Sequence, residues 1–169
     1  TESGIITTGS LDINNNGAVT LAGNNLVTSL GAVTTVGGFT FHDNAGGLSL
    51  TSPINDGAGA VNISTVGGPL ALGANSVSGL GVTLQGAGVN SLAGGNVNGG
   101  ANDVLINGGS GVINLAGNVL TSSNSATALR IVNATTVDVA NLTTGTAGGT
   151  TTLVTANNIT GAVNQSGII

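Results

Sequence analysis

Residues 39–63 read FTFHDNAGGLSLTSPINDGAGAVNI. Three segments in this stretch, residues 39–41, 48–50 and 61–63, alternate apolar with polar side chains, and Gly, Asn, Asp or Pro separates them. Alternation with a period of two predicts short β-strands bounded by turns. The segment that starts at Val61 repeats the one that starts at Phe39, so the stretch is one unit of a repeat.

The same pattern recurs along the whole chain in three interleaved columns of strand starts. Within each column the step is 19 to 25 residues and clusters at 22. The starts are residues 11, 33, 54, 77, 97, 119, 142 and 163 in the first column, 19, 39, 61, 82, 104, 129 and 151 in the second, and 26, 48, 70, 89, 113, 137 and 159 in the third. Three strands and three turns per 22 residues are typical of a parallel β-helix.

We therefore predict an all-β fold: a right-handed parallel β-helix, or β-solenoid, of about seven triangular coils, with residues 1–169 as a single domain. A β-sandwich also has short strands and turns, but it does not predict three columns with one period. Stacked strands are about 4.8 Å apart, so seven coils make a rod on the order of 34 Å long.

The alternation also predicts which side chains point inward. We expect one apolar ladder at Leu21, Phe41, Ile63, Leu84, Ile106, Ile131 and Leu153. We expect the residue before each of these to face solvent, namely Thr20, Thr40, Asn62, Thr83, Leu105, Arg130 and Thr152. Corner residues with positive φ are expected at the pairs Gly37-Gly38, Gly46-Gly47, Gly67-Gly68, Gly99-Gly100 and Gly148-Gly149. Exposed Asn and Thr rows are expected to add hydrogen bonds between coils.

The composition excludes several classes of function. The 169 residues include one Arg, no Lys, six acidic residues and two Phe, and the net charge is -5. A single cation cannot neutralise a run of phosphates, and no aromatic platform is available to stack bases, so we expect no nucleic-acid partner. Gly, Asn or Thr interrupts every apolar run, so we expect no membrane-spanning helix. The absence of Cys excludes disulfides and thiolate sites.

Neither end of the sequence carries a recognisable polar cap, and we expect a solenoid that is uncapped at both ends. End coils without caps expose the core and open strand edges. The chain is therefore expected to be a segment of a longer repeat protein, or a subunit that stacks end to end on identical subunits.

The phrases at residues 17–24 (GAVTLAGN) and 47–52 (GLSLTS), the low charge and the missing Cys resemble filamentous-haemagglutinin-like exoproteins of two-partner secretion. The passenger domains of autotransporters look similar. The resemblance implies an exported, rod-shaped protein of the bacterial cell surface, commonly an adhesin, with host or cell-surface glycans or proteins bound through other domains. The Asn-Pro-Asn motifs of the secretion-signal domain are absent, which favours a stalk.

Three local features contain residues that could carry chemistry. His42 and Asp43 are the one imidazole-carboxylate neighbour pair, and we expect them to form a solvated turn. Residues 99–109 resemble a calcium-binding nonapeptide in a single copy, whereas calcium needs 6 to 8 oxygens from neighbouring turns. The hydroxyls of Thr20, Thr40, Thr83 and Thr152 could begin an ice-binding row, but Asn62, Leu105 and Arg130 interrupt it. We therefore expect no catalytic residue, no cofactor and no metal site.

The function expected from these observations is a structural stalk or fibre segment of an extracellular adhesin-like exoprotein, without catalysis. One alternative is a self-assembling subunit of a homopolymeric filament. Another is a module that binds glycan or protein through the lateral row containing Asn62, Leu105 and Arg130. The last is a polysaccharide-active enzyme that depends on His42 or Asp43.

Overall fold

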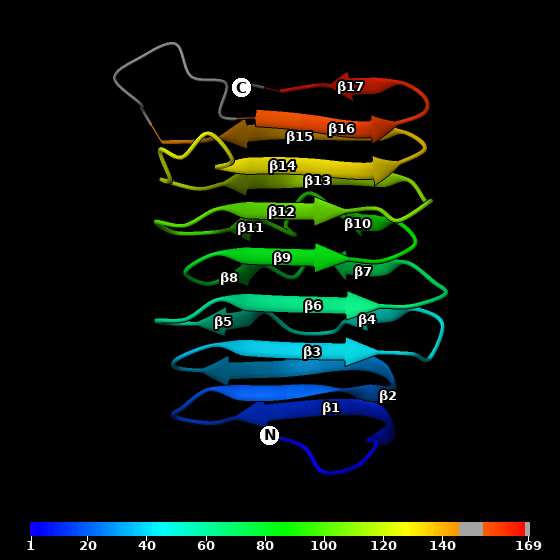
Figure 1. Cartoon of the computed structure of the whole chain (residues 1–169), viewed down its shortest axis with the longest axis vertical. Helices are drawn as coiled ribbons and strands as arrows, with labels where there is room; N and C mark the ends of the chain where they lie inside the picture. Colours follow the sequence, from blue (N-terminus) through cyan, green and yellow to red (C-terminus); the bar gives the residue numbers. More distant parts are fainter. Residues whose placement is uncertain (146–153, 168–169) are drawn as a thin grey trace.

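The computed structural model describes residues 1–145 and 154–167 and shows a rod of stacked coils (Figure 1). These residues form seventeen strands and no helix. Every pairing between the described strands is parallel. The strands nearest the viewer run to the right, and the chain returns behind them as it rises from the N-terminus, so the winding is right-handed. The predicted parallel β-solenoid is confirmed.

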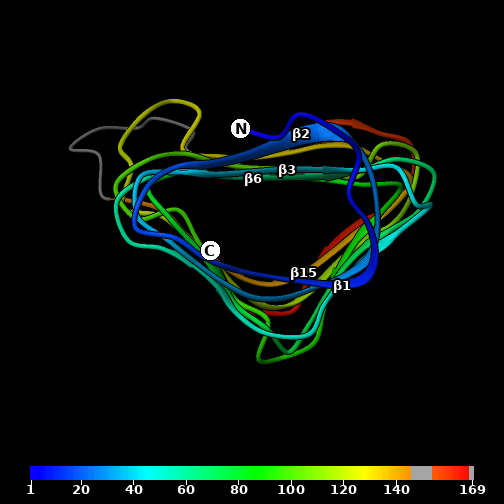
Figure 2. The same ribbon diagram turned by 90° about the horizontal axis from the view of Figure 1, so that it is seen from below.

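The coils have three faces, which give the rod a triangular cross-section (Figure 2). The Phe39 face contains the start of β2 (Val19–Thr35) and β3 (Phe39–Asp43), β6 (Val61–Thr65), β9 (Val82–Gln85), β12 (Val104–Asn107), β14 (Leu129–Ala134) and β16 (Val154–Ile159). The Leu48 face contains β4 (Leu48–Leu50), β7 (Leu70–Gly73), β10 (Val89–Ser91) and β17 (Val163–Gln165). The Ile54 face contains β5 (Ile54–Asp56), β8 (Val77–Ser78) and β11 (Val97–Asn98). Four of the described strands bend across the corner between the last two faces: β1 (Thr7–Asn14), β2, β13 (Ile113–Leu120) and β15 (Val137–Thr143).

The core is built from apolar side chains that stack on like side chains one coil away. Phe41 pairs with Leu21 below and Ile63 above, and the ladder continues through Leu84, Ile106 and Ile131 as the alternation predicted. Phe41 and Ile63 are each 1% exposed. The rings of Phe39 and Phe41 stack within β3, with centroids 6.2 Å apart. Burial of these rows and the continuous backbone ladder hold the coils together.

Glycines with positive φ lie at several corners. Positive φ occurs at both residues of the pairs Gly37-Gly38 and Gly46-Gly47, as predicted. Gly67 and Gly100 also have positive φ, but their neighbours Gly68 and Gly99 do not. Gly148-Gly149 lies outside the described residues.

Two strand starts near the N-terminus were predicted incorrectly. Leu26 was predicted to begin an inward-facing strand, but it is 41% exposed and Val27 is fully buried instead. The alternation within β2 continues through the buried corner residue Asn25, which places residue 27 inside. Val33 pairs with Ile13 rather than with Leu11, because the β1–β2 register shifts between residues 11 and 13.

The columns of the last coil were also predicted incorrectly. The steps from Val104 to Leu129 and from Leu129 to Val154 are both 25 residues, so the second column reaches residue 154 rather than 151. Ile159 consequently pairs with Ala134 in the second column, and Val163 pairs with Val137 in the third. In the step from Val104 to Leu129 the extra residues lie in the segment 121–128, which belongs to no strand. The predicted ladder position of Leu153 passes to Ala156, and both Thr152 and Leu153 lie outside the described residues.

Apolar side chains in the first and last described coils are only partly covered. Ile6, Leu11, Ile13, Val19 and Leu21 pack against the core from the N-terminal end, and Ile159 does so near the C-terminal end. Val163 is 56% exposed. None of the described residues belongs to a helix with the length and apolar character that a bilayer crossing requires.

Candidate functional site

The acidic side chains are the first candidates for chemistry, and all six bond to a residue of a neighbouring coil. These carboxylates belong to Glu2, Asp12, Asp43, Asp56, Asp103 and Asp138, and their partners one coil away include Gly23, Ala32, Thr65, Thr35, Ser123 and Asn164. Each carboxylate therefore accepts hydrogen bonds that tie one turn of the rod to the next. This shared role has no local signal in the sequence, because these partners lie 20 to 26 residues away along the chain.

Asp56 is the most heavily bonded carboxylate. It ends β5 at the corner before the Phe39 face and is 3% exposed. It accepts hydrogen bonds from the Thr35 hydroxyl at 2.7 Å and from the backbone N–H groups of Gly37, Gly38, Ala58 and Gly59. Burial alone would raise the pKa of Asp56, but these hydrogen bonds outweigh it and lower the pKa below its usual value.

Asp43 has the same role at another corner. Its side chain is fully buried and accepts hydrogen bonds from the Val27 N–H at 3.0 Å, the Ala45 N–H at 3.1 Å and the Thr65 hydroxyl at 2.9 Å. Val27 belongs to the coil below and Thr65 to the coil above, so one carboxylate connects three coils.

The predicted solvated turn at His42 and Asp43 is wrong, because both residues lie in strand β3 and Asp43 is fully buried. They are adjacent in β3, so their side chains point to opposite sides of the sheet: Asp43 is buried, whereas His42 lies half-buried on the outside. The structure instead brings Ser64 to His42, with 2.8 Å between Nδ1 and the hydroxyl oxygen. A Ser-His hydrolase needs a third group that orients the imidazole, and here the neighbouring carboxylate points into the core.

Asp103 lies in the segment that resembles a calcium-binding turn. Its oxygens accept hydrogen bonds from three hydroxyls of the next coil, those of Ser123 at 2.6 Å, Ser125 at 2.7 Å and Thr127 at 2.6 Å. The Ser123 and Thr127 hydroxyls lower the pKa of Asp103 most; burial opposes them, while Ser125 and the positive charge of Arg130 lower it further. The described residues contain no group of three or more His, Cys, Asp or Glu that could hold a metal ion.

Asparagine side chains form two ladders along the rod. In one, Asn133 donates to the Asn107 carbonyl oxygen at 3.2 Å and Asn158 donates to that of Asn133 at 2.9 Å. In the other, Asn141 donates to Asn118 at 2.8 Å. Asn133 and Asn158 both adopt positive φ, at 55° and 57°. These ladders confirm for Asn the predicted hydrogen bonds between coils.

The Phe39 face presents the row of side chains that alternation placed outside. Thr20 is exposed, and Thr40, Asn62, Thr83, Leu105 and Arg130 are half-buried between their neighbours in the row. Asn62 pairs with Thr40 and Thr83, and Leu105 pairs with Thr83 and Arg130, so the Thr positions do not form a continuous file. The Nε atom of Arg130 is buried and has no hydrogen-bond partner in the described part of the chain.

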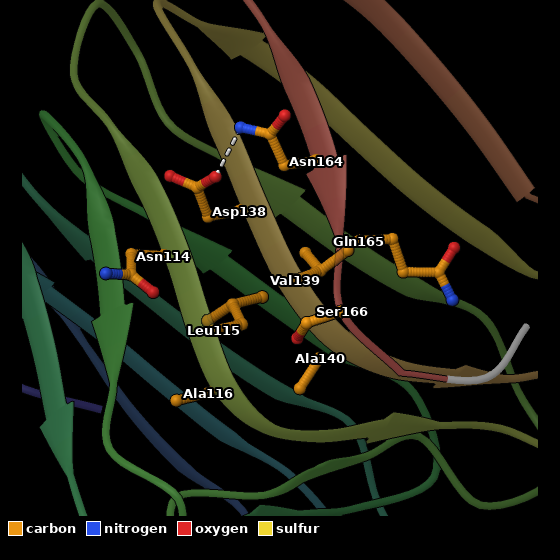
Figure 3. Close-up of a pocket in the computed structure, with 9 residues that line it drawn as sticks. All are labelled: Asn114, Leu115, Ala116, Asp138, Val139, Ala140, Asn164, Gln165 and Ser166. Atoms are coloured by element: carbon orange, nitrogen blue, oxygen red, sulfur yellow. Dashed lines mark hydrogen bonds between the residues drawn. The ribbon is translucent and has the colours of Figure 1, made fainter.

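A hollow of about 300 Å³ lies on the Leu48 face near the C-terminal end (Figure 3). Successive coils contribute Asn114, Asp138 and Asn164, and Asn164 donates to Asp138 at 2.7 Å. Its other lining residues are mostly small or apolar, such as Leu115 and Ala140. It holds one acid and no histidine, so it does not provide a pair of acid and base groups for general acid-base catalysis.

Comparisons with protein-family models, with curated proteins and with solved structures gave no match to this chain.

Proposed function

We propose that this solenoid is a structural segment, a stalk or fibre, of an extracellular bacterial adhesin-like exoprotein. In this role it performs no catalysis. It acts as a spacer that holds a binding domain, located elsewhere in the protein, away from the cell surface. The resemblance of its repeats to filamentous-haemagglutinin-like and autotransporter passenger sequences supports the location and the class of protein.

The observation that carries this proposal is that every carboxylate accepts a hydrogen bond from a residue of a neighbouring coil. A catalytic or binding site needs polar groups that remain available to a ligand. Here the six carboxylates and the two Asn ladders make hydrogen bonds that resist the separation of neighbouring coils. Such a distribution suits a rod that must keep its length and shape.

A deletion of one coil tests the spacer role in the natural protein. Val61 is in register with Val82, so removing residues 61–81 joins Ala60 to Val82 and pairs β3 directly with β9. We expect the shortened protein to reach the cell surface, to be labelled by antibody on intact cells, and to keep the attachment of those cells to their target surface. Attachment lost from a correctly displayed deletion variant would contradict the spacer role.

Substitution of the outward row distinguishes the spacer from a direct binding module. If the Phe39 face itself binds a glycan or protein, replacing Asn62, Leu105 and Arg130 together by Ala abolishes attachment. If the segment is only a spacer, the same variant keeps the attachment.

The extracellular location is tested by antibody labelling of the cells. Labelling only after the cells are permeabilised would contradict this location.

End-to-end self-assembly is a second candidate function. The partly covered apolar side chains of the first and last described coils favour it, since a second copy stacked on either end would bury them. The purified chain is then expected to form species whose length grows with concentration in sedimentation velocity. Introducing a charge at the N-terminal end, Leu11→Asp, should stop this growth, whereas Asn55→Asp on a lateral face should not.

A further inference from the structure

The chain contains three Asn-Gly sequences, at Asn16-Gly17, Asn98-Gly99 and Asn107-Gly108. Asn followed by Gly is the sequence in which the backbone nitrogen of the second residue most readily attacks the side-chain amide of the first, because Gly has no Cβ to obstruct the approach. The attack also requires that this nitrogen be free of other bonds and that the local backbone can move. The three sites differ in whether the glycine N–H is hydrogen-bonded.

At two of the sites the glycine N–H is hydrogen-bonded to the next coil. The N–H of Gly99 donates to the Leu120 carbonyl at 2.9 Å, and the N–H of Gly108 donates to the Val132 carbonyl at 3.0 Å. Gly99 and Gly108 are both buried. Attack at either site must first break a hydrogen bond between coils, so it depends on local opening of the rod.

The side chains of these two asparagines are held as well. The Asn98 carbonyl oxygen accepts the N–H of Gly100 at 2.8 Å. The Asn107 carbonyl oxygen accepts the N–H of Gly109 at 3.0 Å and the Asn133 amide at 3.2 Å. Both asparagines are half-buried.

The third site is open. Asn16 is exposed at the corner between β1 and β2. Among the described residues, no hydrogen bond reaches the side chain of Asn16 or the N–H of Gly17; the corner is held by Asn15, which donates its N–H to the Thr34 carbonyl at 3.0 Å and its side-chain amide to the Gly17 carbonyl at 2.9 Å.

We propose that Asn16 is a site of spontaneous deamidation in the folded protein. The Gly17 nitrogen forms a bond to Cγ of Asn16, its proton leaves with the amide group as ammonia, and a succinimide ring results. Water then opens the ring to aspartate or isoaspartate. The product carries one more negative charge, and the isoaspartate form also adds a methylene to the backbone at this corner.

One digestion separates the three sites. An endoproteinase that cleaves before Asp releases fragments starting at Asp12, Asp56 and Asp103, which carry Asn16, Asn98 and Asn107 respectively. The enzyme also cleaves before an Asp formed at any of these three positions, so the shorter fragments that begin there are counted as converted together with the uncleaved isoaspartate fragments. After incubation of the folded chain at neutral pH and physiological temperature, mass spectrometry of the fragments is expected to show Asn16 converting at least about tenfold faster than the other two. In concentrated urea the three rates should agree within about threefold, because the unfolded chain protects none of them.

Gly17→Ala is the matched variant. Gly17 does not have positive φ, and an added Cβ would meet only the Asn15 side chain, at an ordinary 3.5 Å, so the fold should be kept. Conversion at Asn16 is expected to slow by about tenfold, because the Cβ obstructs the attack. The proposal is overturned if Asn98 or Asn107 converts as fast as Asn16 in the folded chain, if Asn16 is protected relative to urea, or if Gly17→Ala leaves the rate at Asn16 unchanged.

Discussion

At the scale of single residues, the six carboxylates act as connectors between coils. Asp43 and Asp56 are buried, yet each is surrounded by donors from its own corner and from an adjacent coil. Buried carboxylates are stable only when their oxygens are hydrogen-bonded. The donors here are hydroxyls and backbone N–H groups rather than cations, since the chain has a single Arg.

Removing the Asp56 carboxylate should destabilise the rod. Asp56→Ala leaves the Thr35 hydroxyl and four backbone N–H groups without their acceptor. We expect the free energy of unfolding, measured with urea, to fall by about 3 kcal/mol. Asp12→Ala is the control: Asp12 is exposed and accepts one bond, from the Ala32 N–H, so its loss should cost about 1 kcal/mol or less. Equal losses for the two variants would contradict the connector role of Asp56.

The lowered pKa values of Asp56 and Asp103 predict acid sensitivity. Both groups bind protons less readily in the folded chain than in the unfolded chain, where the pKa is about 3.9. Their contribution to stability is therefore complete above that value and is lost as the pH falls through the folded pKa values. Urea midpoints measured from neutral pH down to about pH 2 should decline in this acid range.

The double variant Asp56→Asn/Asp103→Asn isolates this contribution. Asn does not titrate, so the acid decline of the urea midpoint should be smaller than in the unmodified chain, although the stability at neutral pH is lower. An acid decline as large as in the unmodified chain would show that other groups cause it.

At the scale of strands, alternation divides each element between the core and the outside. β3 buries Phe39, Phe41 and Asp43 and leaves Thr40 and His42 half-exposed. The same alternation places the side chains of His42 and Asp43 on opposite sides of the sheet, so these two residues, adjacent in the sequence, do not form a site together. Conversely, register brings Ser64 beside His42 from a strand 22 residues away.

Truncation of an inward residue should therefore cost far more than truncation of the residue before it. Phe41→Ala removes a ring that stacks on Phe39 and packs between Leu21 and Ile63, and we expect a loss of about 3 to 5 kcal/mol in the free energy of unfolding. Thr40→Ala, on the outside of the same strand, should change it by about 0.5 kcal/mol or less. Thermal and urea unfolding followed by circular dichroism measure both, and similar losses would contradict the assigned alternation.

At the scale of the whole molecule, the rod is a one-dimensional stack in which each coil contacts the coils above and below it. Stability in such proteins is close to a sum over repeats and their interfaces. Whole coils are therefore the units that can be removed, and fractions of a coil are not. Because Val61 is in register with Val82, a deletion of one whole coil begins at residue 61 and ends at residue 81.

Deletion of residues 61–81 should leave a folded chain, shorter by about 4.8 Å, the spacing of one strand. The urea dependence of its unfolding free energy should fall in proportion to the surface no longer buried. Deletion of residues 61–71 is the control, because it removes only part of a coil and leaves the coil that contains β3 without a complete coil to pair with at the junction. Small-angle scattering and circular dichroism distinguish the two; a folded control variant would mean that the register is not fixed by the core.

The repeat by itself determined the architecture: the three columns, the inward ladder from Leu21 to Ile131 and the outward row beside it follow from a period of two within a period of about 22. Local alternation is enough because every strand meets the same kind of neighbour one coil away. Only the tertiary structure decided the register where the period changes, as at Leu26, Val154 and Val163, because pairing there depends on contacts between coils and not on the alternation within one strand. It also decided the roles of the carboxylates and of the three Asn-Gly sites. Their partners come from other coils, so no local sequence signal specifies which groups are bonded and which are free.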